Sequence, residues 1–338
     1  MRGNNNYSFL ILLYFLILHI LRSSSCIDKC GDIKIPFPFG IGNGCYLDEW
    51  YEIVCKKNAS SGKEFPFLFK IKMEVVNISL PINYDGYANF RLFSSIRVKS
   101  PISSVGCSSD GAESGSPLNL TDSPFFFGDG NSLVAVGCNN KASLTNVETR
   151  MVGCQSTCTT SNNSQSIPFF ETFGCSSRYQ GMLPTNYIPV CNTTKKREET
   201  ICNGNGCCQA SAPAGGQQVI GVTIANINDG NLTTGGECKV AFLTDEVYTL
   251  ANATKPELFL SEGHATVSLG WFIQTKNLSF RELLGCQNKD EFDNTQLKRR
   301  TAKCTCDNHT ISRTSYASCA CLKGYRGNPY LRDDCKGK

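Results

Sequence analysis

The stretch CGDIKIPFPFGIGNGCYLDEWYEIVC, residues 30–55, decides what kind of fold this chain adopts. Its cysteines stand at 30, 45 and 55, its prolines alternate with phenylalanine, and its glycines cluster at 40, 42 and 44. Pro36 and Pro38 restrain the backbone to extended shapes and remove two ladder donors, a pattern typical of an edge strand. The glycines predict a turn. We therefore expect short extended segments, joined by turns and cross-linked by cysteines.

Phe37 and Phe39 admit two interpretations. They are either rings packed in the core of a sheet or rings offered to a ligand, and the alternation with proline favours packing. The exposed alternative is an aromatic surface, formed by these two rings together with Tyr46 and Trp50.

Strand patterns continue outward from this stretch. Apolar and polar residues alternate, most clearly where Ile96 and Val98 stand against Arg97 and Lys99. The segments expected to form strands are 67–80, 88–100, 217–227, 238–250 and 265–275. The expected fold is mostly β, built from disulfide-rich, short-stranded extracellular modules.

The cysteines point to an oxidising compartment. The chain of 338 residues contains 20 cysteines, an even number, and only 18% of its residues are charged. Zinc is the competing explanation, because the spacings of Cys154–Cys158 and Cys202–Cys208 also occur in zinc sites. No histidine stands near them, so disulfides are expected and no metal ligand is assigned. Neighbouring Cys207 and Cys208 cannot easily pair with one another and are expected to tie two segments together.

Residues 1–25 have the layout of a secretory signal peptide. An early Arg2 precedes an apolar run over 9–21 and three serines at 23–25. This run is shorter than the roughly 20 apolar residues of a membrane helix. We expect a secreted chain that has no membrane span after the signal is cleaved.

Acceptors for N-linked glycans are spread through the chain, which supports the same compartment. They are Asn58, Asn77, Asn119, Asn162, Asn192, Asn231, Asn252, Asn277 and Asn308.

Charge and motifs exclude several functions. A formal net charge of +4 is too small for the basic footprint of a nucleic-acid-binding domain. The chain has no Gly-x-Ser-x-Gly elbow, no His-Glu-x-x-His motif and no kinase signature. No catalytic residue and no cofactor is assigned, and the protein is not expected to be an enzyme. The competing hypothesis is a secreted hydrolase, whose carboxylate pair composition alone cannot locate.

The C-terminal segment CACLKGYRGNPYLRDDC, residues 319–335, resembles the second half of an epidermal-growth-factor-like (EGF-like) module. That resemblance implies a small EGF-like piece in which Cys321 pairs with Cys335. Cys304 and Cys306 lie closer together than such a module normally places them, so a degenerate version is expected. No acidic cluster for calcium precedes it.

The stretch 30–55 resembles the galacturonan-binding module of plant wall-associated receptor kinases. The shared features are Cys30-Gly31, the run IPFPFG over 35–40, Cys45 and Cys55; CNGNGCC (202–208), Trp271-Phe272 and GYRGNPYL (324–331) follow in the family's order. The expected division is a signal peptide (1–25), a galacturonan-binding-like module (26–140), a second cysteine-rich module (147–285) and the degenerate EGF-like module (286–338). The calcium-binding module, membrane span and kinase of such receptors are expected to be absent.

The resemblance implies a receptor-like ectodomain that binds galacturonan, the acidic backbone of pectin, in the plant cell wall. Because galacturonan is a polyanion, its site needs several cations, preferably on strands where alternate residues share a face. The candidates are Lys56, Lys57, Lys70, Lys72, Arg91, Arg97 and Lys99. Two alternatives stay open: these cations form an ordinary solvated surface, or the chain is a protein-binding decoy or co-receptor for a membrane-bound relative.

Overall fold

The computed structural model describes residues 26–81, 94–107, 117–128, 130–147, 151–158, 202, 204–213, 216–227, 237–249, 253, 255–274, 286–288, 303–311 and 314–337. The signal peptide, Arg91, Cys175, Cys191 and the acceptors Asn162, Asn192, Asn231, Asn252 and Asn277 lie outside these residues.

The elements of the N-terminal half are β1 (Lys29–Cys30), β2 (Ile33–Lys34), the 3-10 helix η1 (Glu49–Tyr51), β3 (Ile53–Lys57), β4 (Glu64–Leu68), β5 (Met73–Ser79), β6 (Ser94–Pro101), β7 (Ser103–Val105), β8 (Leu118–Asn119), β9 (Phe125–Phe127), β10 (Ser132–Val136), β11 (Asn140–Thr145) and β12 (Gly153–Ser156).

Those of the C-terminal half are β13 (Cys207–Ser211), β14 (Val219–Asn226), β15 (Lys239–Thr244), the helix α2 (Pro256–Glu262), β16 (His264–Trp271), β17 (Ile273–Gln274), β18 (Gln287–Asn288), β19 (Cys304–Ile311), β20 (Thr314–Cys321), β21 (Tyr325–Arg326) and β22 (Lys336–Gly337).

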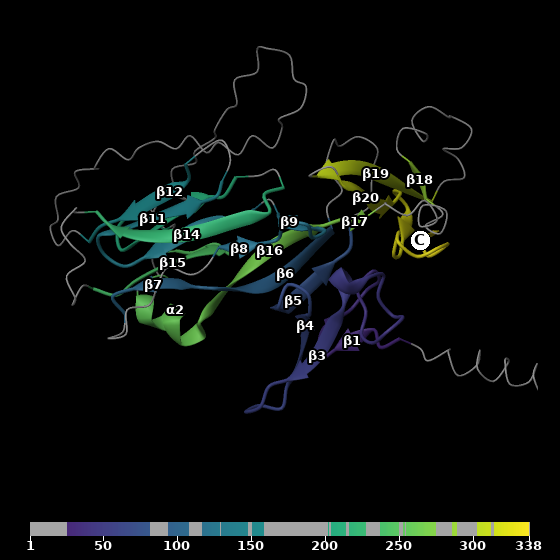
Figure 1. Ribbon diagram of the computed structural model, residues 1–338, viewed down its shortest axis with the longest axis horizontal. Helices are drawn as coiled ribbons and strands as arrows, with labels where there is room; N and C mark the ends of the chain where they lie inside the picture. Colours follow the sequence, from purple (N-terminus) through teal and green to yellow (C-terminus); the bar gives the residue numbers. More distant parts are fainter. Residues whose placement is uncertain are drawn as a thin grey trace, which may run out of the picture.

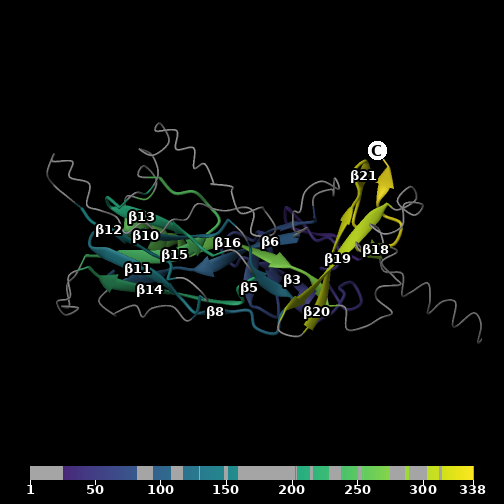
Figure 2. The ribbon, with the colours of Figure 1, turned by 90° about the horizontal axis from the view of Figure 1, so that it is seen from above.

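The molecule is mostly β, as the sequence predicts, and it is elongated (Figure 1). At one end lie two four-stranded sheets, with strand orders β13-β10-β15-β7 and β12-β11-β14-β8. A six-stranded sheet, β3-β4-β5-β6-β16-β9, leads from there to the N-terminal hairpins. The sheet β17-β20-β19-β18 and the C-terminus lie at the other end (Figure 2).

Strands from both sides of the expected boundary at 140–147 share sheets. β6 of the first segment pairs along its whole length with β16 of the second, and β10 pairs with β13 and β15. The domain boundaries stay a prediction. In the part of the chain that the structure describes, the hydrogen-bonded sheets cross them.

The strand expected over 67–80 is a hairpin instead. β4 ends at Leu68, β5 begins at Met73, and Leu68 pairs with Met73 across a four-residue turn in which Lys72 has φ +56°. The hairpin brings Leu68 and Met73 to the same buried face of the sheet, which a single strand could not do. The prediction that Lys70 and Lys72 lie on a strand is therefore wrong, and both belong to the turn.

The proline run also departs from expectation, because residues 36–38 form a turn and not an edge strand. The amide of Phe39 donates to the carbonyl of Pro36 (2.9 Å), and the Phe37–Pro38 peptide bond is cis. Gly40 follows at a close approach of two backbones, where a Cβ would lie 2.1 Å from the carbonyl oxygen of Cys45. The turn directs Phe39 into the core, where it is 1% exposed.

One aromatic cluster joins three distant parts of the chain. The ring of Trp271, fully buried on β16, lies 5.2 Å from the ring of Phe39, 6.3 Å from that of Tyr51 and 5.2 Å from that of Tyr330. The side-chain amide of Asn328 donates to the carbonyl of Phe37 (2.6 Å), so the GYRGNPYL segment packs directly on the proline turn. The motifs at the two ends of the chain thus meet in one core.

Disulfides pair the described cysteines, and none of these is free. The pairs are Cys26–Cys45, Cys30–Cys55, Cys107–Cys238, Cys138–Cys158, Cys154–Cys208, Cys202–Cys207, Cys286–Cys304, Cys306–Cys319 and Cys321–Cys335. The predicted pairing of Cys321 with Cys335 is confirmed. So is the prediction for Cys207 and Cys208, which bond to different segments.

Two kinds of feature are absent from the described residues. No helix there has the length and apolar character needed to cross a membrane. No three His, Cys, Asp or Glu side chains there come together in an arrangement that could hold a metal ion.

Candidate functional site

Carboxylate partners divide the predicted cations into two groups. Arg97 and Lys99 alternate on one face of β6, as predicted, and both are held by half-buried carboxylates. Lys56, Lys57, Lys70 and Lys72 lie farther along the sheet, on β3 and in the β4–β5 turn, and their side chains are exposed. Arg91 lies outside the described residues.

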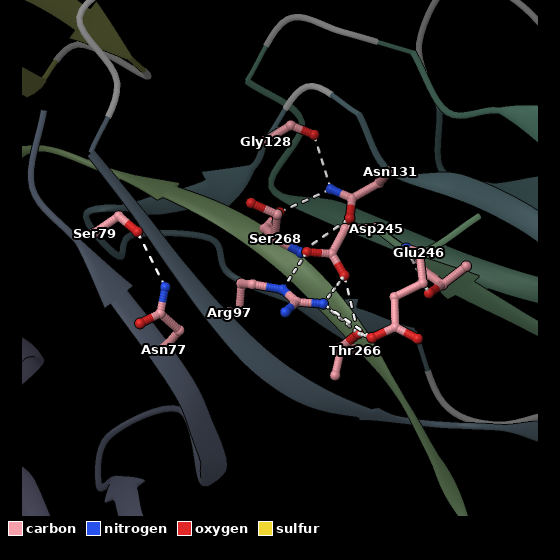
Figure 3. A network of polar contacts seen from close by, with 10 residues as sticks. Asn77, Ser79, Arg97, Gly128, Asn131, Asp245, Glu246, Thr266 and Ser268 are labelled. Atoms are coloured by element: carbon pink, nitrogen blue, oxygen red, sulfur yellow. Dashed lines mark hydrogen bonds and ion pairs between the residues drawn. The ribbon is translucent and has the colours of Figure 1, made fainter. Parts of the chain in front are cut away.

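Arg97 is the centre of a polar network (Figure 3). Its Nε and Nη2 atoms donate to the two oxygens of Asp245, at 2.5 and 2.8 Å, and Nη2 also donates to Glu246 and to Thr266, each at 3.0 Å. The bonds to Asp245 raise the pKa of Arg97, so the guanidinium stays charged. Because several acceptors hold its guanidinium, Arg97 connects β6 to the segment that follows β15.

We expect Arg97→Gln to lower the free energy of unfolding by about 2 kcal/mol. Asp245, whose side chain is 13% exposed, would lose its partner, and the cost lies between those of exposed and buried pairs. Urea unfolding with the disulfides intact measures it. Lys99→Gln is the matched control, because its partner Glu74 is 29% exposed and keeps more water. Equal unfolding midpoints for the two variants would contradict a fastening role for Arg97.

The exposed pairs are of a different kind. Lys57 lies 3.4 Å from Glu64, with side chains 72% and 45% exposed, and Lys70 lies 2.8 Å from Glu49. Such pairs contribute roughly 0.2–1 kcal/mol each, so a carboxylate of a ligand can replace the protein's own at little cost. We name Lys56, Lys57, Lys70 and Lys72 the β3–β5 lysines.

Aromatic rings lie close to two of the β3–β5 lysines, Lys56 and Lys70. Lys56 is on the edge strand β3 and Phe67 is on the neighbouring strand β4. The ammonium of Lys56 lies 3.1 Å from the ring centroid of Phe67. The ammonium of Lys70 lies 5.3 Å from the ring centroid of Trp50. Phe67 lies three residues before Lys70, so the two cations lie on the order of 10 Å apart along the hairpin.

Local structure positions Trp50. Asp48 caps η1 by accepting from the amide of Trp50 (2.9 Å), and the amide of Phe69 donates to the carbonyl of Glu52 (3.1 Å), which holds the β4–β5 turn against η1. Burial raises the pKa of Asp48, and the bond from Trp50 opposes that rise. The sequence predicted Lys70 as a candidate cation but did not predict its neighbours Glu49 and Trp50, because these contacts join separate segments of the chain.

The aromatic alternative fails for one of its rings. Phe39 is buried in the core and cannot meet a ligand, while Phe37, Tyr46 and Trp50 are half-buried. The interpretation of Phe39 as a packing residue is confirmed.

The glycan acceptors Asn58, Asn77 and Asn119 are exposed, and Asn308 lies on β19. Asn77 pairs with Arg97 across β5 and β6, and its amide donates to the hydroxyl of Ser79 (3.2 Å), the third residue of the acceptor motif (Figure 3). A glycan on Asn77 would stand on the sheet face that carries Arg97 and Lys99.

Comparison with protein families finds two matches. A family described as wall-associated receptor kinase galacturonan-binding matches residues 26–85, and one described as wall-associated kinase matches residues 199–280. The first contains η1, β3, β4, β5 and all four β3–β5 lysines.

Three proteins of Arabidopsis thaliana are similar over nearly the whole chain. Wall-associated receptor kinase-like 13 is 67% identical over 343 residues, wall-associated receptor kinase-like 11 is 53% identical over 349, and wall-associated receptor kinase-like 17 is 48% identical over 349. The aligned regions cover 99%, 99% and 98% of this chain, and 44%, 43% and 42% of those proteins. The chain therefore spans less than half the length of these relatives. No solved structure matches it.

Proposed function

Because this chain is a relative of the wall-associated receptor kinase-like proteins and carries their galacturonan-binding module, we propose that it binds de-esterified pectin in the plant cell wall. The observation that carries the proposal is the coincidence of that module with the β3–β5 lysines, which are exposed and only weakly paired. The sequence has no kinase signature. The chain acts in this proposal by binding.

Charge supports a polyanionic ligand. One exposed lysine contributes too little for useful affinity, since even a millimolar dissociation constant requires about 4 kcal/mol. Several lysines along one polymer add their contributions, and the repeated carboxylates of the polymer add avidity. Binding should therefore depend on the charge of the polymer and on salt.

We expect the secreted, disulfide-bonded protein to be retained on immobilised polygalacturonate and to pass through the methyl-esterified polymer, which lacks the charge. Retention should fall as the salt rises from about 0.05 M to about 0.5 M, because the screening length shortens several-fold. Affinity chromatography and binding isotherms measure both effects. Equal retention on the two polymers would reject an ionic site, and release of new reducing ends would favour the hydrolase.

A further inference from the structure

We propose that Trp50, Phe69, Lys70 and Lys72 form the subsite that recognises one uronate unit of the polymer, and that Glu49 regulates it by occupying Lys70. We name these five residues the η1–turn ridge. The inference rests on the proposed function and goes further, since it assigns the contact to one end of the hairpin and explains the preference for the free acid.

The ridge is built from two segments that the fold holds together. Residues 49 and 50 belong to η1 and residues 69–72 to the β4–β5 turn. Three contacts tie them to one another: Phe69 N–H to the carbonyl of Glu52 (3.1 Å), Lys70 to Glu49 (2.8 Å) and Lys70 to the Trp50 ring (5.3 Å). The geometry is thus present before any ligand arrives, which lowers the entropic cost of binding.

The ridge carries exposed apolar surface. Phe69 is 55% exposed, although a large aromatic side chain normally gains by burial. It stands next to Lys70, and Lys72 follows in the same turn with an exposed side chain. An exposed ring in the same turn as two exposed lysines complements a ligand that has both an apolar ring face and a carboxylate, as a uronate does.

Glu49 is the element of control. Its side chain is 66% exposed and that of Lys70 is 37% exposed, so the pair is open to water and exchangeable. A uronate carboxylate would displace Glu49 from Lys70, whereas a methyl ester has no charge with which to compete. The ridge therefore selects the free acid by requiring the ligand to replace a carboxylate that is already present.

The test compares Glu49→Gln with Asp32→Asn. Each removes one carboxylate from the same module and frees one exposed lysine, since Asp32 pairs with Lys63 (3.4 Å) away from the ridge. We expect Glu49→Gln to tighten binding to polygalacturonate about 2- to 5-fold, the range of one exposed ion pair. Asp32→Asn should leave it unchanged, and neither variant should gain on methyl-esterified polymer.

Phe69→Ala supplies the second arm. We expect about 3- to 10-fold weaker binding to polygalacturonate, the value of a lost aromatic contact. Leu258→Ala, at an equally exposed apolar position (56%) on α2, should have no effect. Unfolding midpoints verify that both variants keep the fold.

The two proposals fail in different ways. If the unaltered protein is retained but Glu49→Gln matches Asp32→Asn and Phe69→Ala binds normally, the ridge is rejected and galacturonan binding stands. If the unaltered protein is not retained on polygalacturonate, both are rejected.

Discussion

Replacement of Lys56, Lys57, Lys70 and Lys72 together by Gln is expected to weaken binding to polygalacturonate roughly thirtyfold. Each exposed cation contributes about 0.2–1 kcal/mol, so four together contribute about 2 kcal/mol, and 1.4 kcal/mol is a factor of ten. The loss should grow step by step as the lysines are replaced one after another, because no single contact dominates. Binding isotherms at low salt measure it.

The control removes the same charge elsewhere. Lys255, Lys323, Arg326 and Lys336 are all exposed and lie outside the galacturonan-binding match at residues 26–85, and their replacement by Gln changes the net charge equally. We expect this variant to bind within twofold of the unaltered protein. If both fourfold variants lose affinity alike, the attraction comes from overall charge and not from the β3–β5 lysines.

Trp271→Ala is expected to lower the free energy of unfolding by about 3 to 5 kcal/mol, the usual cost of deleting a large buried ring. Trp271 is fully buried and packs on Phe39, Tyr51 and Tyr330, which come from the proline turn, η1 and the C-terminal piece. The cavity would therefore weaken all three regions together. Urea unfolding, followed by fluorescence and by far-ultraviolet circular dichroism, should show one shifted transition.

Trp271→Phe separates packing from hydrogen bonding. The indole Nε1 has no hydrogen-bond partner among the described residues, so this change deletes only part of the ring volume. We expect a loss of about 1 to 2 kcal/mol. A loss as large as that of Trp271→Ala, or two separate transitions in either variant, would contradict a single core that joins the three regions.

Much of the fold could be predicted from local chemistry. Alternation around Ile96 and Val98 indicated a half-buried strand, and β6 has that burial pattern. The hairpin between β4 and β5 was missed, because residues 67–80 have strand composition throughout and only the shared face of Leu68 and Met73 requires a turn. The turn at 36–38 was missed for a similar reason, since proline is compatible with both an edge strand and a turn.

The sequence by itself determined the disulfide-rich β class from its composition. Its resemblance to known modules, carried by motifs within short segments, determined the kinship with a galacturonan-binding module and the pairing of Cys321 with Cys335. Only the tertiary structure decided which cations are available. Arg97 looked equivalent to Lys70 along the chain, yet the fold brings Asp245 to Arg97 across 148 residues and leaves Lys70 with an exposed, exchangeable partner. Whether a charge is free depends on carboxylates supplied by other strands, and sheet pairing, not sequence distance, places them.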